Sequence, residues 1–142
     1  MKKILTLTLA ILMLTLALTS CNFNISGAIL DATSTPKVEA MMEALAKGDL
    51  TSAKSLLHPD RTDGEKYLPQ MVDYLDGRGV SSLEVTGKNV TRSAGSGGNV
   101  TQEQVTYKAT LTDDTVIYLS TVYLTNDTGE GFVSFQMVLG MV

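Results

Sequence analysis

The run of residues 104–111 constrains the fold most, because polar and apolar side chains alternate along it without interruption. The residues of one parity are apolar or aromatic: Val105, Tyr107, Ala109 and Leu111. The residues of the other parity are polar: Gln104, Thr106, Lys108 and Thr110. Successive side chains of a β-strand point to opposite faces of its sheet. The run therefore predicts a strand with one face in a core and the other in water, as in an antiparallel sheet covered on one side.

The chain after Gly79 is expected to form a meander of about four strands. Runs of strand character cover residues 80–92, 99–112, 115–125 and 132–142. Short segments rich in Gly, Asn and Asp join them, at residues 95–98, 113–114 and 126–131. The last two runs carry apolar residues at both parities, which is typical of strands that are covered on both faces. We therefore expect these two strands to be the central or most covered ones.

Before Gly79 the apolar residues recur with the period of a helix. The first pattern has four residues at positions i, i+3, i+4 and i+7: Val38, Met41, Met42 and Leu45. It predicts a helix that begins at Pro36, is capped by Thr35 and ends at Gly48. A proline suits the first helical position because the N–H that it lacks would have no partner there.

Two shorter helices are expected after Gly48. Asp49 is placed to cap the first of them, and Pro59 to end it. The second lies between Asp63 and Gly77, with Pro69 in its first turn or at a kink. Helices followed by a strand meander predict an α+β domain, with N-terminal helices packed on the apolar face of a curved antiparallel sheet.

The predicted helices carry a family resemblance. Residues 42–50 read Met-Glu-Ala-Leu-Ala-Lys-Gly-Asp-Leu, followed by Ala53, Leu56, Leu57 and the His58-Pro59-Asp60 breaker. This order resembles the helix, glycine turn and second helix that open many nuclear-transport-factor-2-like domains. The resemblance extends over residues 36–142 and implies a cystatin-like α+β roll. The sequence departs from it between Asp60 and Glu65, where many members have a strand and none is evident here.

The first 21 residues have the pattern of an export signal. Lys2 and Lys3 precede an uncharged stretch, Ile4 to Leu18, of roughly 15 residues, fewer than the ~20 that a membrane-spanning helix needs. The residues Leu18-Thr19-Ser20-Cys21 then resemble the lipobox of bacterial lipoproteins. The resemblance implies a lipid on the Cys21 thiol and cleavage just before it. We expect residues 1–21 to direct the protein to the extracytoplasmic face of the cell membrane, residues 22–35 to be a tether and residues 36–142 to form the domain.

Charge and residue counts argue against several classes of function. Removing Lys2 and Lys3 leaves nine basic and 15 acidic side chains, a net charge of −6, which argues against binding nucleic acid. His58 is the only histidine and Cys21 the only cysteine, so a Cys–His zinc site cannot be assembled. The acidic turns at Asp113 and Asp127 are expected at opposite ends of a meander, too far apart to share an ion. We predict no metal and no cofactor.

Candidate site residues lie on the face that should meet the helices. Glu103 shares the parity of Val105 and Tyr107, and burial would raise its pKa and make it a plausible proton acceptor. Contact with a ligand, or ordinary solvation at a strand end, are the alternatives for this carboxylate. Four tyrosines and three methionines could line a cavity between helices and sheet, although ordinary core packing explains them more simply: Tyr67, Tyr74, Tyr107, Tyr123, Met41, Met42 and Met71. His58 is interpreted first as part of a helix-ending turn.

These patterns favour a lipid-anchored, non-enzymatic lipoprotein that binds a small hydrophobic ligand or another envelope protein. The alternative is a small acid–base enzyme of the isomerase or dehydratase kind that uses Glu103. A third hypothesis is an assembly module that pairs through the open face of the sheet. That face is polar along residues 102–110, which favours a monomer or a weak dimer.

Overall fold

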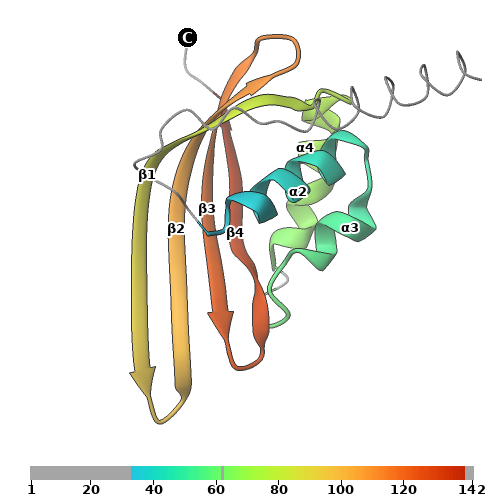
Figure 1. The fold of residues 1–142 in the computed structure, drawn as a ribbon. Coiled ribbons are helices and arrows are strands. Elements are labelled where there is room, and N and C mark those ends of the chain that lie inside the picture. Colours follow the sequence, from blue (N-terminus) through green and yellow to red (C-terminus); the bar gives the residue numbers. More distant parts are fainter. Residues whose placement is uncertain (1–32, 62, 140–142) are drawn as a thin grey trace, which may run out of the picture.

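The computed structural model describes residues 33–61 and 63–139, which form an α+β domain (Figure 1). The helical elements are α2 (Thr35–Ala46), α3 (Leu50–Ser55), the 3-10 helix η1 (Asp63–Tyr67) and α4 (Leu68–Leu75). The strands follow as β1 (Val80–Gly95), β2 (Gly98–Leu111), β3 (Val116–Asn126) and β4 (Gly129–Leu139). The predicted signal peptide, the lipid-attachment residue Cys21 and most of the predicted tether lie outside the described residues.

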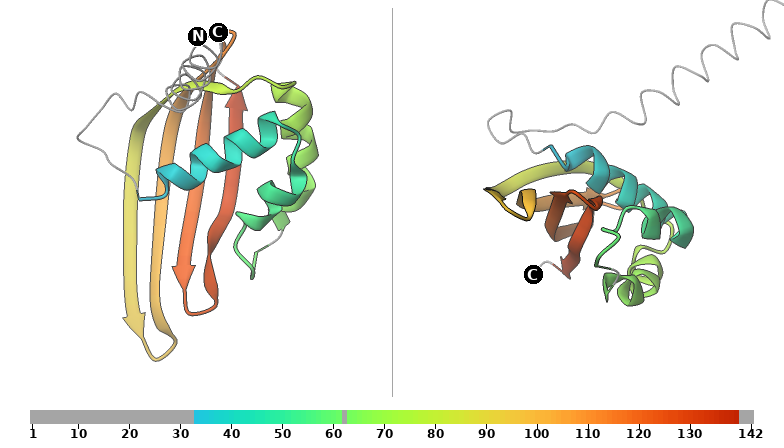
Figure 2. Two further views of the ribbon diagram at one scale, coloured as in Figure 1. Left: turned by 45° about the vertical axis from the view of Figure 1, so that its right-hand side comes forward. Right: turned by 90° about the horizontal axis from the view of Figure 1, so that it is seen from below.

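The four strands form one antiparallel sheet in the order β1-β2-β3-β4, which confirms the predicted meander. Tyr107 of β2 pairs with Val85 of β1 and with Leu119 of β3, so the inward residues of the three strands lie side by side. The helices pack on one face of the curved sheet and extend past β4 (Figure 2). Fully buried apolar residues of both layers fill the core: Val38, Met41, Leu45, Val105, Tyr107, Ala109, Leu111, Ile117 and Phe132. The predicted inward face of β2 is confirmed.

The helix starts follow the predictions in part. Asp49 caps α3 as expected, because its Oδ1 accepts the backbone N–H of Ser52 at 3.1 Å. Pro69 lies in the first turn of α4, as predicted. The prediction that Thr35 caps α2 is wrong, since Thr35 is already helical and Ser34 is the capping position. The side chain of Ser34 makes no capping bond of its own either.

The prediction for the last strand is also wrong in one respect. β3 lies inside the sheet as expected, but β4 is an edge strand. Its apolar residues at both parities have another cause, because Tyr123 pairs with Phe132 and Val122 with Ser134, which leaves Val133 as a bulge. The bulge reverses the parity of the inward residues, so Phe132 and Phe135 are both buried. Residues 56–58 leave α3 and pair with the start of this edge. Leu57 forms a parallel bridge with Phe132, which ends α3 at Ser55, well before Pro59. A Cβ on Gly131 would lie 2.4 Å from the His58 nitrogen, so this close approach requires glycine.

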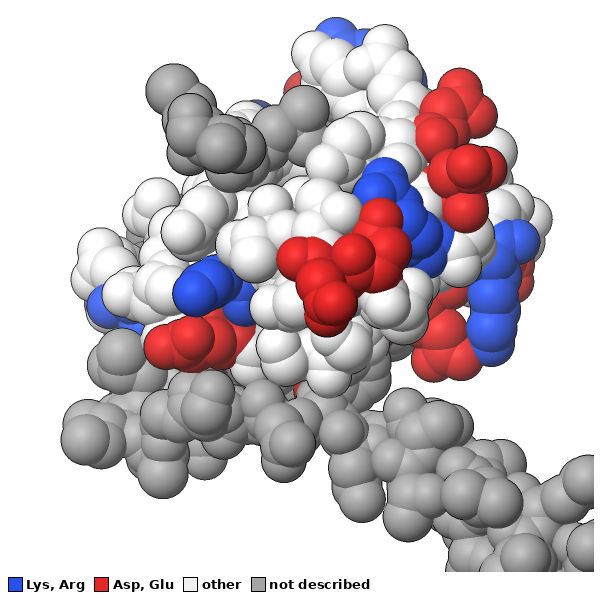
Figure 3. All heavy atoms as spheres, turned by 90° about the horizontal axis from the view of Figure 1, so that it is seen from above, with Lys and Arg blue, Asp and Glu red and all other residues white. Residues whose placement is uncertain are grey.

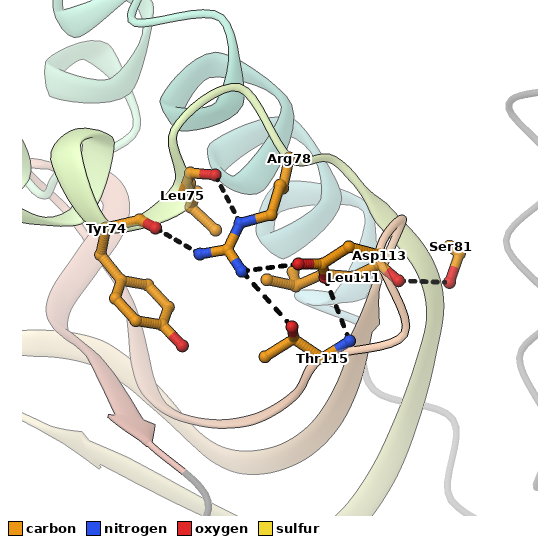
Figure 4. A network of polar contacts seen from close by, with 7 residues as sticks. All are labelled: Tyr74, Leu75, Arg78, Ser81, Leu111, Asp113 and Thr115. Carbon is orange, nitrogen blue, oxygen red and sulfur yellow. Dashed lines mark hydrogen bonds and ion pairs between the residues drawn. The ribbon is translucent and has the colours of Figure 1, made fainter.

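The C-terminus of α4 is fastened to the β2–β3 turn by Arg78 (Figure 4). Its guanidinium donates to the carbonyl oxygens of Leu75 at 2.9 Å and Tyr74 at 2.5 Å, and to Asp113 Oδ2 at 2.9 Å. Hydrogen bonds from Thr115 and from Arg78 lower the pKa of Asp113 from 3.8 to about 2. The helix that borders β4 is therefore held at one end by a charged side chain.

Acidic and basic side chains of the described residues are interspersed on the face seen in Figure 3. Several charged side chains of the described residues form exposed ion pairs, including Lys47 with Glu43 at 2.5 Å and Lys54 with Glu65 at 2.6 Å. Exposed pairs of this kind contribute little to stability. The stability of the fold depends mainly on its apolar core.

Candidate functional site

The structure does not bring the predicted site residues together in one place. Glu103 and Tyr107 lie at the start of α2, and Tyr123 packs on β3 against Phe132. Tyr67 and Tyr74 lie at η1 and α4, beside β4. Two regions therefore have to be considered separately: the corner at the start of α2 and the space between α4 and β4.

The first region, here called the Glu103 corner, consists of Glu103, Thr33, Ser34, Thr35 and Tyr107. Glu103 points inward, as predicted, and its exposed fraction is 5%. Its carboxylate accepts four hydrogen bonds, from the backbone N–H groups of Thr33 at 3.3 Å and Ser34 at 2.8 Å and from both hydroxyls. The first N–H groups of a helix have no partner within the helix. Glu103 supplies a capping acceptor for α2 from a distant strand.

These bonds decide the protonation state of Glu103. Burial raises its pKa, but the hydrogen bonds from Ser34 and Thr33 outweigh burial, so the pKa lies below the ordinary value of 4.5. The prediction that burial would leave this pKa raised is therefore wrong, and its cause is a set of donors that strand parity does not reveal. A carboxylate whose oxygens already accept four hydrogen bonds is a poor proton acceptor.

The neighbouring aromatic and methionine side chains of the predicted set are core residues. The Tyr107 ring is fully buried, and its hydroxyl lies 3.2 Å from Thr35 Oγ1. Tyr123 is half-buried, with its ring edge-to-face with Phe132 at a centroid distance of 5.0 Å. Met41 and Met42 are buried in the same core. For these residues the simpler interpretation, core packing, is confirmed.

The second region is an open groove of about 620 Å³, here called the α4–β4 groove. One wall presents Tyr67, Gln70, Met71 and Tyr74. Their spacing of i, i+3, i+4 and i+7 places them on one face of the helical segment. The other wall is β4, which contributes residues 133–137 in succession. The volume lies in the range of roughly 300–1,000 Å³ that is common for ligand sites.

The chemistry of the groove is apolar and neutral along most of its length. Met71 and Phe135 supply apolar surface, while Gln70, Ser134 and Gln136 supply neutral polar groups. The charged residues of the lining, Asp63 and Lys66, both belong to η1. The Lys66 ammonium lies 4.9 Å from the centre of the Tyr67 ring, a cation–π distance. This arrangement suits binding of an apolar or neutral ligand more than proton transfer.

His58 is fully buried beside the groove-bordering strand, where it links the turn after α3 to the end of β3. Its Nδ1 accepts the backbone N–H of Asp60 at 3.1 Å. Nε2 therefore carries the ring proton and donates to Asn126 Oδ1, also at 3.1 Å. Both ring nitrogens are engaged within the fold, in agreement with the interpretation of His58 as part of a helix-ending turn.

Sequence reasoning found one wall of the groove and missed the other. Tyr67, Tyr74 and Met71 were candidates, and their helical spacing marked a common face. Ser134 and Gln136 were not candidates, because the position of β4 at the sheet edge cannot be read from its composition. The mixed polar and apolar residues of 133–137 are the only signal that this strand meets more than one environment.

Comparison with known proteins gives no further guide to the function. No protein-family model matches the chain, and no curated protein or solved structure was found to be similar to it. In residues 33–61 and 63–139, no group of three or more His, Cys, Asp or Glu residues is arranged to hold a metal ion. Among the described helices, none has the length and apolar character needed to cross a membrane.

Proposed function

We propose that this chain is a non-enzymatic lipoprotein, anchored at the extracytoplasmic face of the membrane through Cys21, that binds a small hydrophobic ligand or an envelope protein in the α4–β4 groove. The groove itself carries the proposal, because it joins a volume of about 620 Å³ to a lining of apolar and neutral polar residues. Ligand sites typically have such a lining. Helices N-terminal to a curved four-stranded meander also support a cystatin-like roll of the nuclear-transport-factor-2-like kind.

The positions of the tether and the groove support an anchored binding protein. Thr33 is held at β2 by Glu103, whereas the groove lies beyond β4, at the far edge of the sheet. α2 crosses the sheet between these two regions (Figure 2). An anchor that precedes Thr33 therefore attaches to the domain away from the groove, which leaves the groove accessible from the aqueous side.

The groove is tested by site-specific photo-crosslinking in bacterial cells that express the protein. Tyr67 and Tyr118 are each replaced by benzoylphenylalanine, because their exposed fractions are similar, 49% and 43%, but only Tyr67 lines the groove. We expect an adduct, either a protein or a small molecule detected by mass, from position 67 and none from position 118. Equal labelling at both positions, or none at position 67, would contradict a binding role for the groove.

The anchor is tested separately. Cells are fed an alkyne-bearing fatty acid, and the wild-type protein is compared with Cys21→Ser. We expect label and membrane association in the wild type and the loss of both in Cys21→Ser, because a lipid at this thiol supplies the anchor. A Cys21→Ser protein that still carried label would place the lipid elsewhere.

A further inference from the structure

We infer that the α4–β4 groove binds an extended, uncharged segment of a partner polypeptide, which adds to the edge of β4 as a fifth strand. This inference rests on the proposed binding function and names the class of its ligand. Three observations carry it: the open edge of β4, the strand-like segment that already covers one end of this edge, and the absence of charge along the groove next to the strand.

The edge of β4 offers backbone groups to a partner. β4 is the last strand of the sheet and pairs on one side with β3. Among the described residues, no segment pairs with its other side beyond Phe132. Every second residue of an edge strand turns its N–H and C=O groups away from the sheet. A bulge at Val133 interrupts this alternation. Beyond the bulge, residues 134–137 of the groove extend the regular edge over roughly 10 Å at ~3.3 Å per residue.

The protein itself shows that this edge accepts a further strand. The His58 N–H donates to the Phe132 carbonyl at 2.9 Å, and the Phe132 N–H donates to the Leu56 carbonyl at 2.9 Å. The bridge is parallel and occupies the position of a fifth strand. The groove begins at Val133, the next residue along β4. A partner strand would resume the pairing at Ser134, beyond the bulge that follows the bridge to residues 56–58.

The chemistry of the lining distinguishes a polypeptide from a lipid. An acyl chain in the groove would cover the unpaired N–H and C=O groups of β4 without bonding them, and buried polar groups without partners are unfavourable. An extended peptide satisfies them and places alternate side chains against Met71 and Tyr74. Apart from Asp63 and Lys66 on η1, the residues that line the groove are uncharged. The segment beside residues 133–137 should therefore be uncharged as well.

The test uses the full mature lipoprotein in lipid nanodiscs, with laurate as an acyl-chain probe and two defined peptides. The first is a blocked seven-residue peptide of alternating threonine and valine with a fluorescent label. The second has the same side chains but is methylated at every interior amide nitrogen, which removes its hydrogen-bond donors. Binding is measured by fluorescence anisotropy, and hydrogen–deuterium exchange locates the contact.

We expect the first peptide to slow amide exchange in residues 133–137 by at least tenfold and the methylated peptide to leave it unchanged. Gln70→Glu and Gln136→Glu should each weaken binding at least tenfold, because each places a charge beside the neutral segment. The matched control, Gln104→Glu, makes the same exposed change on the outer face of β2 and should bind as the wild type does. Thermal unfolding of all three variants checks that they remain folded.

Other outcomes would overturn the inference. Equal binding of both peptides would show that side-chain contact alone is responsible. Slower exchange in residues 133–137 with laurate, and not with the first peptide, would assign the groove to an acyl chain and leave the proposed binding function intact. No response to either peptide would refute strand addition, while the Tyr67 crosslink would still decide the proposed function independently.

Discussion

The Glu103 corner and the α4–β4 groove contain similar kinds of residue but differ in how those residues are buried and paired. Each contains a tyrosine that the sequence marked as a candidate, but Tyr107 is fully buried and Tyr67 is 49% exposed. In the corner, hydroxyl, amide and carboxylate groups are paired with one another. In the groove, a helix face and a strand edge lie apart and leave about 620 Å³ between them.

This difference indicates that the corner stabilises the domain, whereas the groove is available for binding. The corner joins residues 70 positions apart in the chain, so its bonds connect the start of α2 to the middle of the sheet. The groove leaves the backbone edge of β4 beyond Phe132 without a described partner. Local departures from complete pairing are expected at functional sites, whereas complete pairing stabilises the fold. Mutations in the two regions should therefore affect different measurements.

The largest effect is expected from Glu103→Ala. The change removes the capping acceptor of α2 and leaves the buried donors of Ser34 without a partner. We expect it to lower the free energy of unfolding by about 2–3 kcal/mol. Gln104→Ala alters the adjacent, exposed residue and should change the free energy of unfolding by less than about 0.5 kcal/mol. Chemical denaturation of both variants makes the comparison, and equal stabilities would show that the corner does not stabilise α2.

A smaller effect is expected where one hydroxyl is removed from each region. Tyr107→Phe loses the contact with Thr35 inside the core and should cost about 1 kcal/mol in the free energy of unfolding. Tyr67→Phe removes a hydroxyl from an exposed ring and should be close to neutral. Thermal and urea unfolding would measure both. A larger cost at Tyr67 than at Tyr107 would reverse the assignment of the two regions.

These comparisons also indicate what could be predicted from the sequence. The period of residues 104–111 and the turns after Gly79 predicted the strands well, because side-chain alternation is a local property. The cap of α2 was misplaced because its acceptor, Glu103, lies far away in the chain. The edge position of β4 was missed because the order of strands depends on tertiary packing. For the same reason, neither wall alone predicted the groove.

A still smaller effect is expected in the pH dependence of stability, to which Glu103 in the corner contributes. The pKa of Glu103 is lowered in the folded state, so its charged form stabilises the fold above the ordinary value of 4.5. That contribution is lost as the pH falls below this value and through the lowered pKa. Glu103→Gln cannot titrate at this site. The difference in stability between wild type and Glu103→Gln should therefore shrink as the pH falls from about 6 towards 3; a difference that is independent of pH would contradict the role of the charge.

The smallest effect on stability is expected from a change at Asp113. This residue is linked through Arg78 to α4, which forms one wall of the groove. Asp113 binds Arg78, which in turn holds the carbonyl groups at the end of α4 (Figure 4). Because the pKa of Asp113 is lowered to about 2, its contribution is present above the ordinary value of 3.8 and is lost as the pH falls towards 2. Asp113→Asn should barely change global unfolding at neutral pH, since the pair is exposed and screened by water.

The consequence of Asp113→Asn should instead be local. Arg78 still bonds the carbonyl groups of Tyr74 and Leu75, but its link to the β2–β3 turn is weakened, so the end of α4 should open more often. Amide exchange is expected to rise in α4 and to stay unchanged at Ser34, in the Glu103 corner. Asp114→Asn, a change at the adjacent turn residue, is the matched control. Faster exchange in both regions would mean that the corner and the groove open as one cooperative unit, and their separation into a stabilising and a binding region would then be wrong.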